Sequence, residues 1–174
     1  MTTPVPFAPS LSLTRKFLAG ESPACGKEWA RCMVQGDLFL SVPVQGGASC
    51  LKGRHVDVRS LLISDHGKWR QEHLGTWNAI YGKTPFFDHL FPEIKQVYAC
   101  HSNGTLGEFN SKLFELAMKF LDLNNLAPDI TEMQNSRPEL IQQSRVEYET
   151  KVNLNYSIFD ALFRLGRNTI WVLI

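Results

Sequence analysis

Residues 64–87, which read SDHGKWRQEHLGTWNAIYGKTPFF, decide how the rest of the chain folds. Within them Trp69, His73, Trp77 and Tyr81 follow one another at intervals of four residues, so a helix would align them in one aromatic ridge. An isolated surface helix gains nothing from two exposed tryptophans. The spacing therefore predicts a helix whose aromatic ridge either packs on the core or lines a pocket.

Capping residues indicate where this helix ends and where the next one begins. Ser64 or Asp65 supplies a side-chain oxygen for a first-turn amide, and Gly82 allows a left-handed turn at the other end. Thr84 is then the predicted cap of a second helix. We expect the second helix to be short or broken, because Pro92 interrupts it.

The segment before residue 64 has the pattern of a small antiparallel sheet. Residues 29–34 and 38–44 are β-prone and flank a turn at Gly36 and Asp37, which predicts a hairpin. Residues 56–63 alternate and then become apolar, which predicts a half-buried strand that enters the core.

The rest of the chain adds helices. Thr105 and Glu108 form a predicted capping box ahead of an apolar stripe, and Ser157 opens a helix that stops at Gly166. The fold class that follows is α+β, a small and mostly antiparallel sheet covered by about four helices. Weaker patterns predict a short strand followed by a turn or a brief helix at 11–17 and a strand at 130–133. Residues 134–143 are predicted to form a long polar loop, and residues 146–154 alternate weakly. The apolar C-terminal segment is expected to dock on the core.

The composition is that of one globular domain over residues 1–174, with an extended, proline-containing lead-in at 1–10. A net charge of +1 gives no argument for a nucleic-acid partner. Without a leader-like segment or an apolar run of membrane length, we expect no membrane insertion and a cytoplasmic location. The cysteine spacing matches neither a zinc site nor a redox dithiol, so we expect free thiols and no metal.

Four polar side chains are candidates for chemistry. His73 is a candidate general acid or base because its ordinary pKa is roughly 6.5, although a histidine at this place also suits the rim of the core. Lys68 and Arg70 are candidates for binding phosphate or carboxylate, or else are solvated helix charges. Arg31 is a further candidate for anion binding, and its alternative is an arginine on an edge strand.

Two tryptophans and one cysteine have alternative interpretations as well. Trp69 and Trp77 can stack on a sugar or a base, but tryptophans at helical spacing are more often core residues. Cys32 needs a nearby base and some exposure to act as a nucleophile, and otherwise is a buried thiol.

Three blocks of sequence carry a family resemblance. They are residues 68–87 with KWRQEH, Trp77 and YGKTPFF, residues 120–124 with FLDLN, and residues 155–166 with NYSIFDALFRLG. Together they resemble the WbqC-like family of bacterial proteins. A weaker similarity covers Ala30-Arg31-Cys32 and LFLSVPV at 38–44, where Ala30 replaces the family's asparagine. The resemblance spans about residues 28–174, and we expect a trimmed or divergent member whose N-terminal region is shortened.

The resemblance implies an acyl or aminoacyl transferase in bacterial polysaccharide, O-antigen or glycoconjugate biosynthesis. In that interpretation His73 is the catalytic base, while Arg31, Lys68 and Arg70 hold anionic groups of a small-molecule or nucleotide-sugar ligand. The alternative is a non-catalytic binding or scaffold protein that retains the fold. The two differ in whether His73 faces a pocket or the core. The sequence points to no particular cofactor and to no particular oligomeric state.

Overall fold

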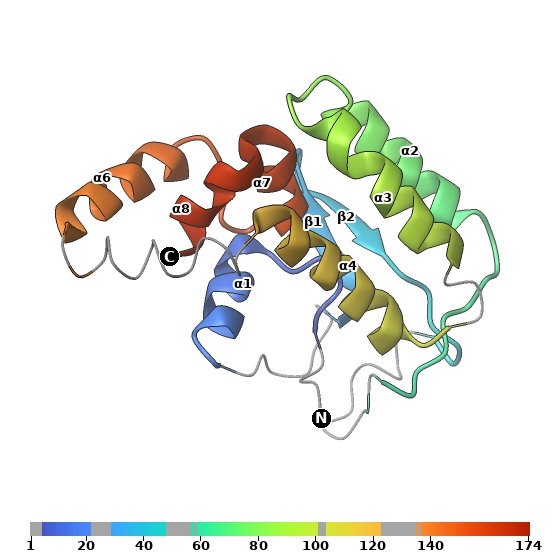
Figure 1. Ribbon diagram of the computed structural model, residues 1–174. Coiled ribbons are helices and arrows are strands. Elements are labelled where there is room, and N and C mark those ends of the chain that lie inside the picture. The colour runs from blue at the N-terminus through green and yellow to red at the C-terminus, as the bar shows by residue number, and fades with distance from the viewer. Residues whose placement is uncertain are drawn as a thin grey trace.

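The computed structural model describes residues 5–21, 29–47, 57, 59–100, 104–122, 135 and 137–174. It is mostly helical around one small antiparallel sheet, so the predicted α+β class is confirmed. In Figure 1 the hairpin lies at the centre, α4 crosses in front of it, and α6 reaches outward. The elements are α1 (Leu11–Leu18), β1 (Arg31–Val34), β2 (Leu38–Ser41), α2 (Trp69–Tyr81), α3 (Phe87–Cys100), α4 (Leu106–Leu121), α6 (Pro138–Glu149), α7 (Ile158–Leu165), a 3-10 turn over Gly166–Thr169 and α8 (Ile170–Leu173).

The predicted hairpin is present as β1 and β2. Arg31 pairs with Ser41 and Val34 with Leu38, in antiparallel register. Successive strand residues point to opposite faces, so Cys32, Val34 and Leu40 are buried while Arg31 and Phe39 lie on the outer face.

The predicted strand at 56–63 is wrong for the part that the structure describes. Leu62 and Ile63 form only single bridges, to Thr105 and Val44 respectively. This segment crosses from the end of the hairpin to the start of α4, as the Leu106 N–H bond to the Leu61 carbonyl (2.7 Å) illustrates. A crossing segment pairs at a few points only and forms no ladder.

Helix α2 confirms the helix predicted from the aromatic ridge, but both of its ends differ from the prediction. The N-cap is Lys68, whose side chain makes no capping bond, and not the predicted Ser64 or Asp65. The Asp65 carboxylate pairs with Arg70 instead. Gly82 has a right-handed conformation at φ −56°, so the predicted left-handed turn is wrong.

Helix α3 runs without a break through Pro92, contrary to the prediction. Because proline has no backbone N–H, the Asp88 carbonyl lacks its usual intrahelical donor at Pro92. Both residues are exposed, so water can donate to this carbonyl instead. Thr84 does not cap this helix, because its hydroxyl donates to the Tyr81 carbonyl at 2.6 Å and closes the end of α2.

The remaining helices mix confirmed and corrected predictions. The Thr105 capping box of α4 is confirmed, with both of its hydrogen bonds present. The segment after Ser10 is the helix α1, and the apolar C-terminal segment docks as α8 with three buried residues. The predicted loop at 134–143 is wrong from Pro138 onward, where α6 begins with proline in its first turn.

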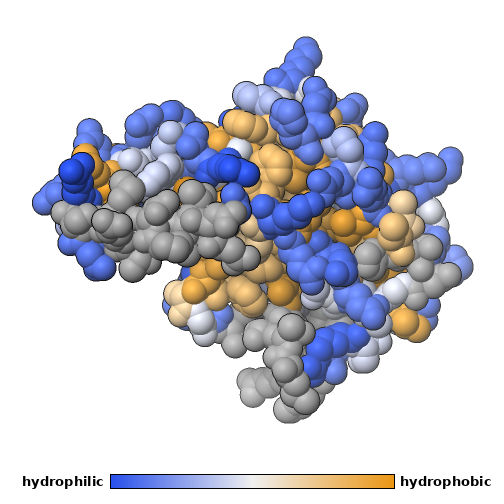
Figure 2. All heavy atoms as spheres, in the orientation of Figure 1, coloured by the Kyte–Doolittle hydropathy of each residue, from blue (hydrophilic) through white to orange (hydrophobic). Residues whose placement is uncertain are grey.

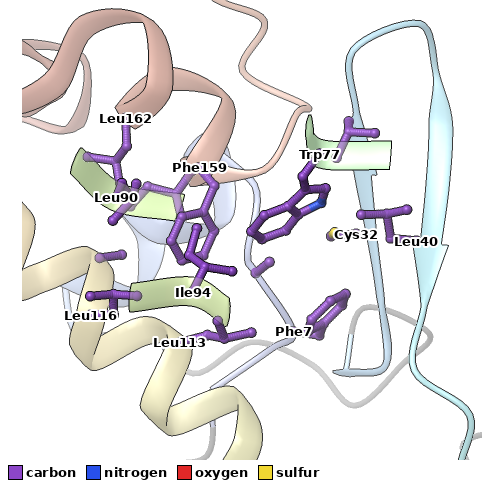
Figure 3. Packing of buried hydrophobic residues seen from close by; sticks show 14 of the residues in the cluster. Phe7, Cys32, Leu40, Trp77, Leu90, Ile94, Leu113, Leu116, Phe159 and Leu162 are labelled. Carbon is purple, nitrogen blue, oxygen red and sulfur yellow. The ribbon is translucent and has the colours of Figure 1, made fainter. Parts of the chain in front are cut away.

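A continuous hydrophobic core joins the inner face of the hairpin to the helices. Figure 3 shows Trp77 of α2 between Phe159 of α7 and the hairpin residues Cys32 and Leu40. The ring centroids of Trp77 and Phe159 are 5.3 Å apart. The ridge of α2 therefore lies at the middle of the core, where the hairpin meets α7.

The lead-in is built into this core. Its residues 5–9 are all buried and are extended or bent, while residues 1–4 lie outside the described part of the chain. The buried Asn110 side chain of α4 donates to the Val5 carbonyl at 2.9 Å and to the Trp29 carbonyl at 2.8 Å. Ser10 then forms a bridge with Ser157, just before α7.

The outer surface is mainly hydrophilic on the face that Figure 2 presents, with hydrophobic residues visible in its middle. No helix in the described part of the chain is long and apolar enough to cross a membrane.

Candidate functional site

All four residues of the α2 ridge lie in the core. Trp69 is 7% exposed, His73 5%, and Trp77 and Tyr81 1% each. The sequence predicted that this ridge either packs on the core or lines a pocket. The structure shows that the ridge as a whole packs in the core.

His73 is enclosed by rings and held by two hydrogen bonds. Phe7 stacks on its imidazole at 5.8 Å between centroids, and Trp69 meets it edge-on at 5.1 Å. Its Nδ1 lies 3.2 Å from the Tyr98 hydroxyl, and the ring donates to the Ser41 carbonyl. With one nitrogen donating to a carbonyl, Nδ1 is left to accept from Tyr98.

Burial dominates the protonation of His73. Loss of solvation lowers its pKa to about 4, and the charge of Arg70 acts in the same direction, while the bond to Ser41 opposes them. The imidazole is therefore neutral at pH 7. It links the edge of β2 to α3 from inside the core.

The two tryptophans also have their faces covered by protein. The Trp69 indole N–H donates to the Ser64 carbonyl at 3.1 Å. Trp77 packs on Phe159 and meets Phe163 edge-on at 5.9 Å, and its buried indole nitrogen has no hydrogen-bond partner in the described part of the chain.

Arg70 and Lys68 differ although they are neighbours. The Arg70 guanidinium donates to Asp65 (2.8 Å) and to the Tyr98 carbonyl (2.9 Å), and it lies 4.4 Å from the Trp69 ring centroid. It thereby joins the loop before α2 to the end of α3. Lys68 is exposed at the start of α2.

A second buried polar group joins the hairpin turn to α2 and α7. The Tyr81 hydroxyl accepts from the Gln35 N–H at 3.2 Å and donates to Asp160, and burial raises its pKa well above the ordinary value. Asp160, 1% exposed, also accepts from Arg164 at 3.1 Å, and Arg164 in turn contacts Gln35. Two of the sequence blocks, around Tyr81 and around Asp160, thus meet in one structural network.

Arg31 lies in a pocket of about 380 Å³ against the outer face of the hairpin. Its guanidinium carbon is 3.5 Å from the centroid of the Phe39 ring, and its buried Nε has no hydrogen-bond partner among the described residues. The other described lining residues include Pro6, Pro9, Leu13, Met33 and Asn155. We refer to this cavity as the Arg31 pocket.

Cys32 also contributes to the wall of the Arg31 pocket, but its thiol is buried. Loss of solvation raises its pKa far above the ordinary value, so the thiolate needed for nucleophilic attack is not formed near neutral pH. Of the two alternatives for Cys32, a nucleophile or a buried thiol, the structure supports the buried thiol.

The structure separates the predicted site residues into two groups. Arg31 lines the pocket, whereas His73, Lys68, Trp69, Arg70 and Trp77 are not among its described lining residues. Phe7 lies between the groups, because it lines the pocket and stacks on His73. Across the described residues, no cluster of three or more His, Cys, Asp or Glu is arranged to hold a metal ion.

Sequence reasoning missed most of the pocket. The only indication that Phe39 lines the pocket is its position in the hairpin, on the same outer face as Arg31 and diagonal to it. Leu13 and Asn155 belong to recognisable segments, but nothing local links them to a pocket, because the backbone bonds that bring their segments together join residues far apart, such as Ser12 N–H to the Leu154 carbonyl at 3.0 Å.

A comparison with protein families supports the resemblance carried by the sequence blocks. The model of the WbqC-like protein family matches residues 28–158, a span that holds the hairpin, α2, α3, α4, α6 and the first residue of α7. No curated protein and no solved structure gives a match. Since the family match covers well over half of the chain, the protein belongs to the WbqC-like protein family.

Proposed function

We propose that this protein binds an anionic small molecule in the Arg31 pocket and acts as a group transferase in bacterial polysaccharide or glycoconjugate biosynthesis. The observation that carries the proposal is the guanidinium of Arg31, which lines a cavity and has no protein anion beside it among the described residues. A partly buried cation without a counter-charge is costly, and an anionic ligand removes that cost.

The guanidinium suits recognition of a carboxylate or a phosphate. Its planar fork offers two parallel N–H groups, and the Phe39 ring beneath it fixes the plane of the fork. In group transfer, a fixed cation of this kind stabilises negative charge that develops on the reacting group. The transferase role itself rests on the family resemblance.

We propose a structural role for His73 in place of the catalytic one. Its imidazole is neutral, is enclosed by Phe7, Trp69 and Tyr98, and is not among the described lining residues of the pocket. A transferase of this design would depend on a donor that carries its own good leaving group, with Arg31 supplying charge stabilisation.

The second candidate function is a non-catalytic binding protein. It is favoured by one observation: the described lining residues of the Arg31 pocket include no His, Asp, Glu or Lys that could transfer a proton. Both functions predict binding of an anion, and only the transferase predicts turnover.

A binding screen followed by a transfer assay tests the proposal. We expect at least one anion from a panel of small carboxylates, acyl-coenzyme A and nucleotide sugars to raise the melting temperature of the wild type, and Arg31→Gln to abolish the shift. Arg167→Gln is the matched control, since Arg167 is exposed and outside the described pocket lining. Mass spectrometry of an amino-sugar acceptor then detects the transferred group. Equal shifts in wild type and Arg31→Gln would contradict the proposal, whereas binding without product would favour the binding protein.

A further inference from the structure

We infer that the ligand of the Arg31 pocket is a monoanionic carboxylate with a compact apolar body, and not a diphosphate such as a nucleotide sugar. This inference rests on the proposed function, since it concerns the same pocket. It follows from the number of charges in the pocket, the character of its walls and its size.

The charge of the pocket favours a monoanion. Arg31 is the one ionisable basic side chain among the described lining residues, and the polar groups beside it, Ser10 and Asn155, are neutral. One guanidinium balances one negative charge. A diphosphate brings at least two, and the second would lie against apolar walls without a counter-charge, which is unfavourable.

The geometry around the guanidinium favours a carboxylate. Stacking of Arg31 on Phe39 at 3.5 Å directs the guanidinium N–H groups sideways along the ring surface. Two parallel N–H groups in one plane match the two oxygens of a planar carboxylate. The Ser10 hydroxyl accepts from the Leu13 N–H at 3.2 Å, and with no acceptor for its proton among the described residues it can donate to a ligand oxygen.

The wall of the cavity favours a ligand with an apolar body. Pro6, Pro9, Leu13 and Met33 surround the polar corner with apolar surface. The two prolines have fixed φ angles and sit in a buried segment, so this wall is formed before the ligand arrives. A preformed apolar wall favours a ligand whose body is apolar.

The size of the cavity favours a compact ligand. A volume of about 380 Å³ lies near the lower end of the range of small-molecule sites, roughly 300–1,000 Å³. A short-chain or aromatic carboxylic acid suits such a cavity. A nucleotide sugar, with a base, two sugars and two phosphates, would extend well outside it.

Isothermal titration calorimetry with defined probes tests this inference. The probes are benzoate and hexanoate, the neutral analogues benzyl alcohol and hexanol, and the polyanions inorganic phosphate and uridine diphosphate glucose. We expect both carboxylates to bind the wild type at least tenfold more tightly than the neutral analogues and the polyanions. Arg31→Gln should weaken carboxylate binding by about tenfold to a hundredfold, the usual loss for a charged hydrogen-bonding partner. Arg167→Gln should leave it unchanged.

A second variant protects the test against a folding defect of Arg31→Gln. Asn155 is exposed and lines the pocket, so Asn155→Trp fills part of the cavity without disturbing the core. We expect it to weaken hexanoate binding at least tenfold while the far-ultraviolet circular dichroism stays native.

The outcomes separate the two proposals. If uridine diphosphate glucose or phosphate binds more tightly than the carboxylates, and this binding needs Arg31, the carboxylate inference is overturned and anion binding at the pocket stands. If no probe shows binding that depends on Arg31, both fall. Equal affinity for hexanoate and hexanol would likewise overturn the inference, because the charge would then contribute nothing.

Discussion

The ridge around His73 and the Arg31 pocket both contact Phe7, and both combine aromatic rings with a nitrogen-containing side chain. They differ in where their polar atoms find partners. His73 bonds to Tyr98 and Ser41 inside the protein, whereas Arg31 has no described partner for its buried Nε. A group whose bonds are satisfied by the fold stabilises the fold, whereas a guanidinium that lines a cavity without an anion beside it among the described residues is available to a ligand.

This difference implies that substitutions in the two regions have opposite signatures. Changes in the ridge should lower the free energy of unfolding. Changes in the pocket should leave stability nearly constant and remove binding. The four predictions below test that contrast, from the largest expected change in stability to the smallest.

Trp77→Ala should have the largest effect. Trp77 is 1% exposed and packs between α7 and the hairpin, so its truncation leaves a large cavity. We expect a loss of about 3–5 kcal/mol in the free energy of unfolding, measured by urea denaturation. Val146→Ala, at a residue 54% exposed on α6, is the control and should change stability by less than about 0.5 kcal/mol. A loss below about 1 kcal/mol for Trp77→Ala would show that this residue is not at the centre of the core.

Acid should destabilise the protein through His73. The folded pKa is about 4 against an ordinary 6.5, so between these values the unfolded chain binds a proton that the folded chain does not. Stability is therefore lost as the pH falls through this window, by about 3 kcal/mol in total. Urea denaturation at a series of pH values measures the slope.

His73→Gln is the matched variant for the acid prediction. Glutamine can still reach Ser41 and Tyr98 but does not titrate, so the His73 component of the slope between pH 6.5 and pH 4 should disappear. Identical slopes in the variant and the wild type would contradict burial of a neutral imidazole.

Asp160→Asn should cost less, about 1–3 kcal/mol, because it weakens the hydrogen bonds to Tyr81 and Arg164 without opening a cavity. Urea denaturation of Asp160→Asn, Tyr81→Phe and the double variant gives the coupling energy between the two residues. Asp88→Asn, on the exposed face of α3, is the control. Strict additivity of the two single changes would argue against the network.

Arg31→Gln should be close to neutral for stability, within about 0.5 kcal/mol, because the substitution removes a charge that no described residue balances. The same urea denaturation experiment measures it. A loss above about 2 kcal/mol would place Arg31 with the structural residues of the ridge and remove the contrast between the two regions.

The fold could be predicted from sequence wherever local signals decided it. The four-residue spacing of the ridge, the Thr105 capping box and the β-prone flanks of Gly36 each specify an element by themselves. Prediction failed where distant contacts decide. Helix α6 is polar over most of its surface and is held by α8 and by Arg15 of α1, which contacts both Glu149 and the Val172 carbonyl.

The site was only partly predictable for the same reason. Arg31 was a candidate from its residue type, but the sequence also allowed a plain edge-strand arginine. What separates the two is the cavity, which is built from the lead-in, α1, the hairpin and Asn155. The catalytic expectation for His73 came from residue chemistry alone, and the rings of Phe7 and Tyr98 that bury it come from segments far from it in sequence.

The most direct test of the central claim, that the Arg31 pocket and not the His73 ridge receives the ligand, is methyl NMR of protein labelled at the methionine methyl groups. Met33 lines the pocket, while Met118 lies on α4 against the core, and Met33→Leu assigns the signal. On titration with benzoate, and separately with uridine diphosphate glucose, the account predicts that at least one probe shifts the Met33 signal, leaves Met118 unchanged, and has no effect in Arg31→Gln. A Met33 signal that stays fixed while either probe binds would contradict it.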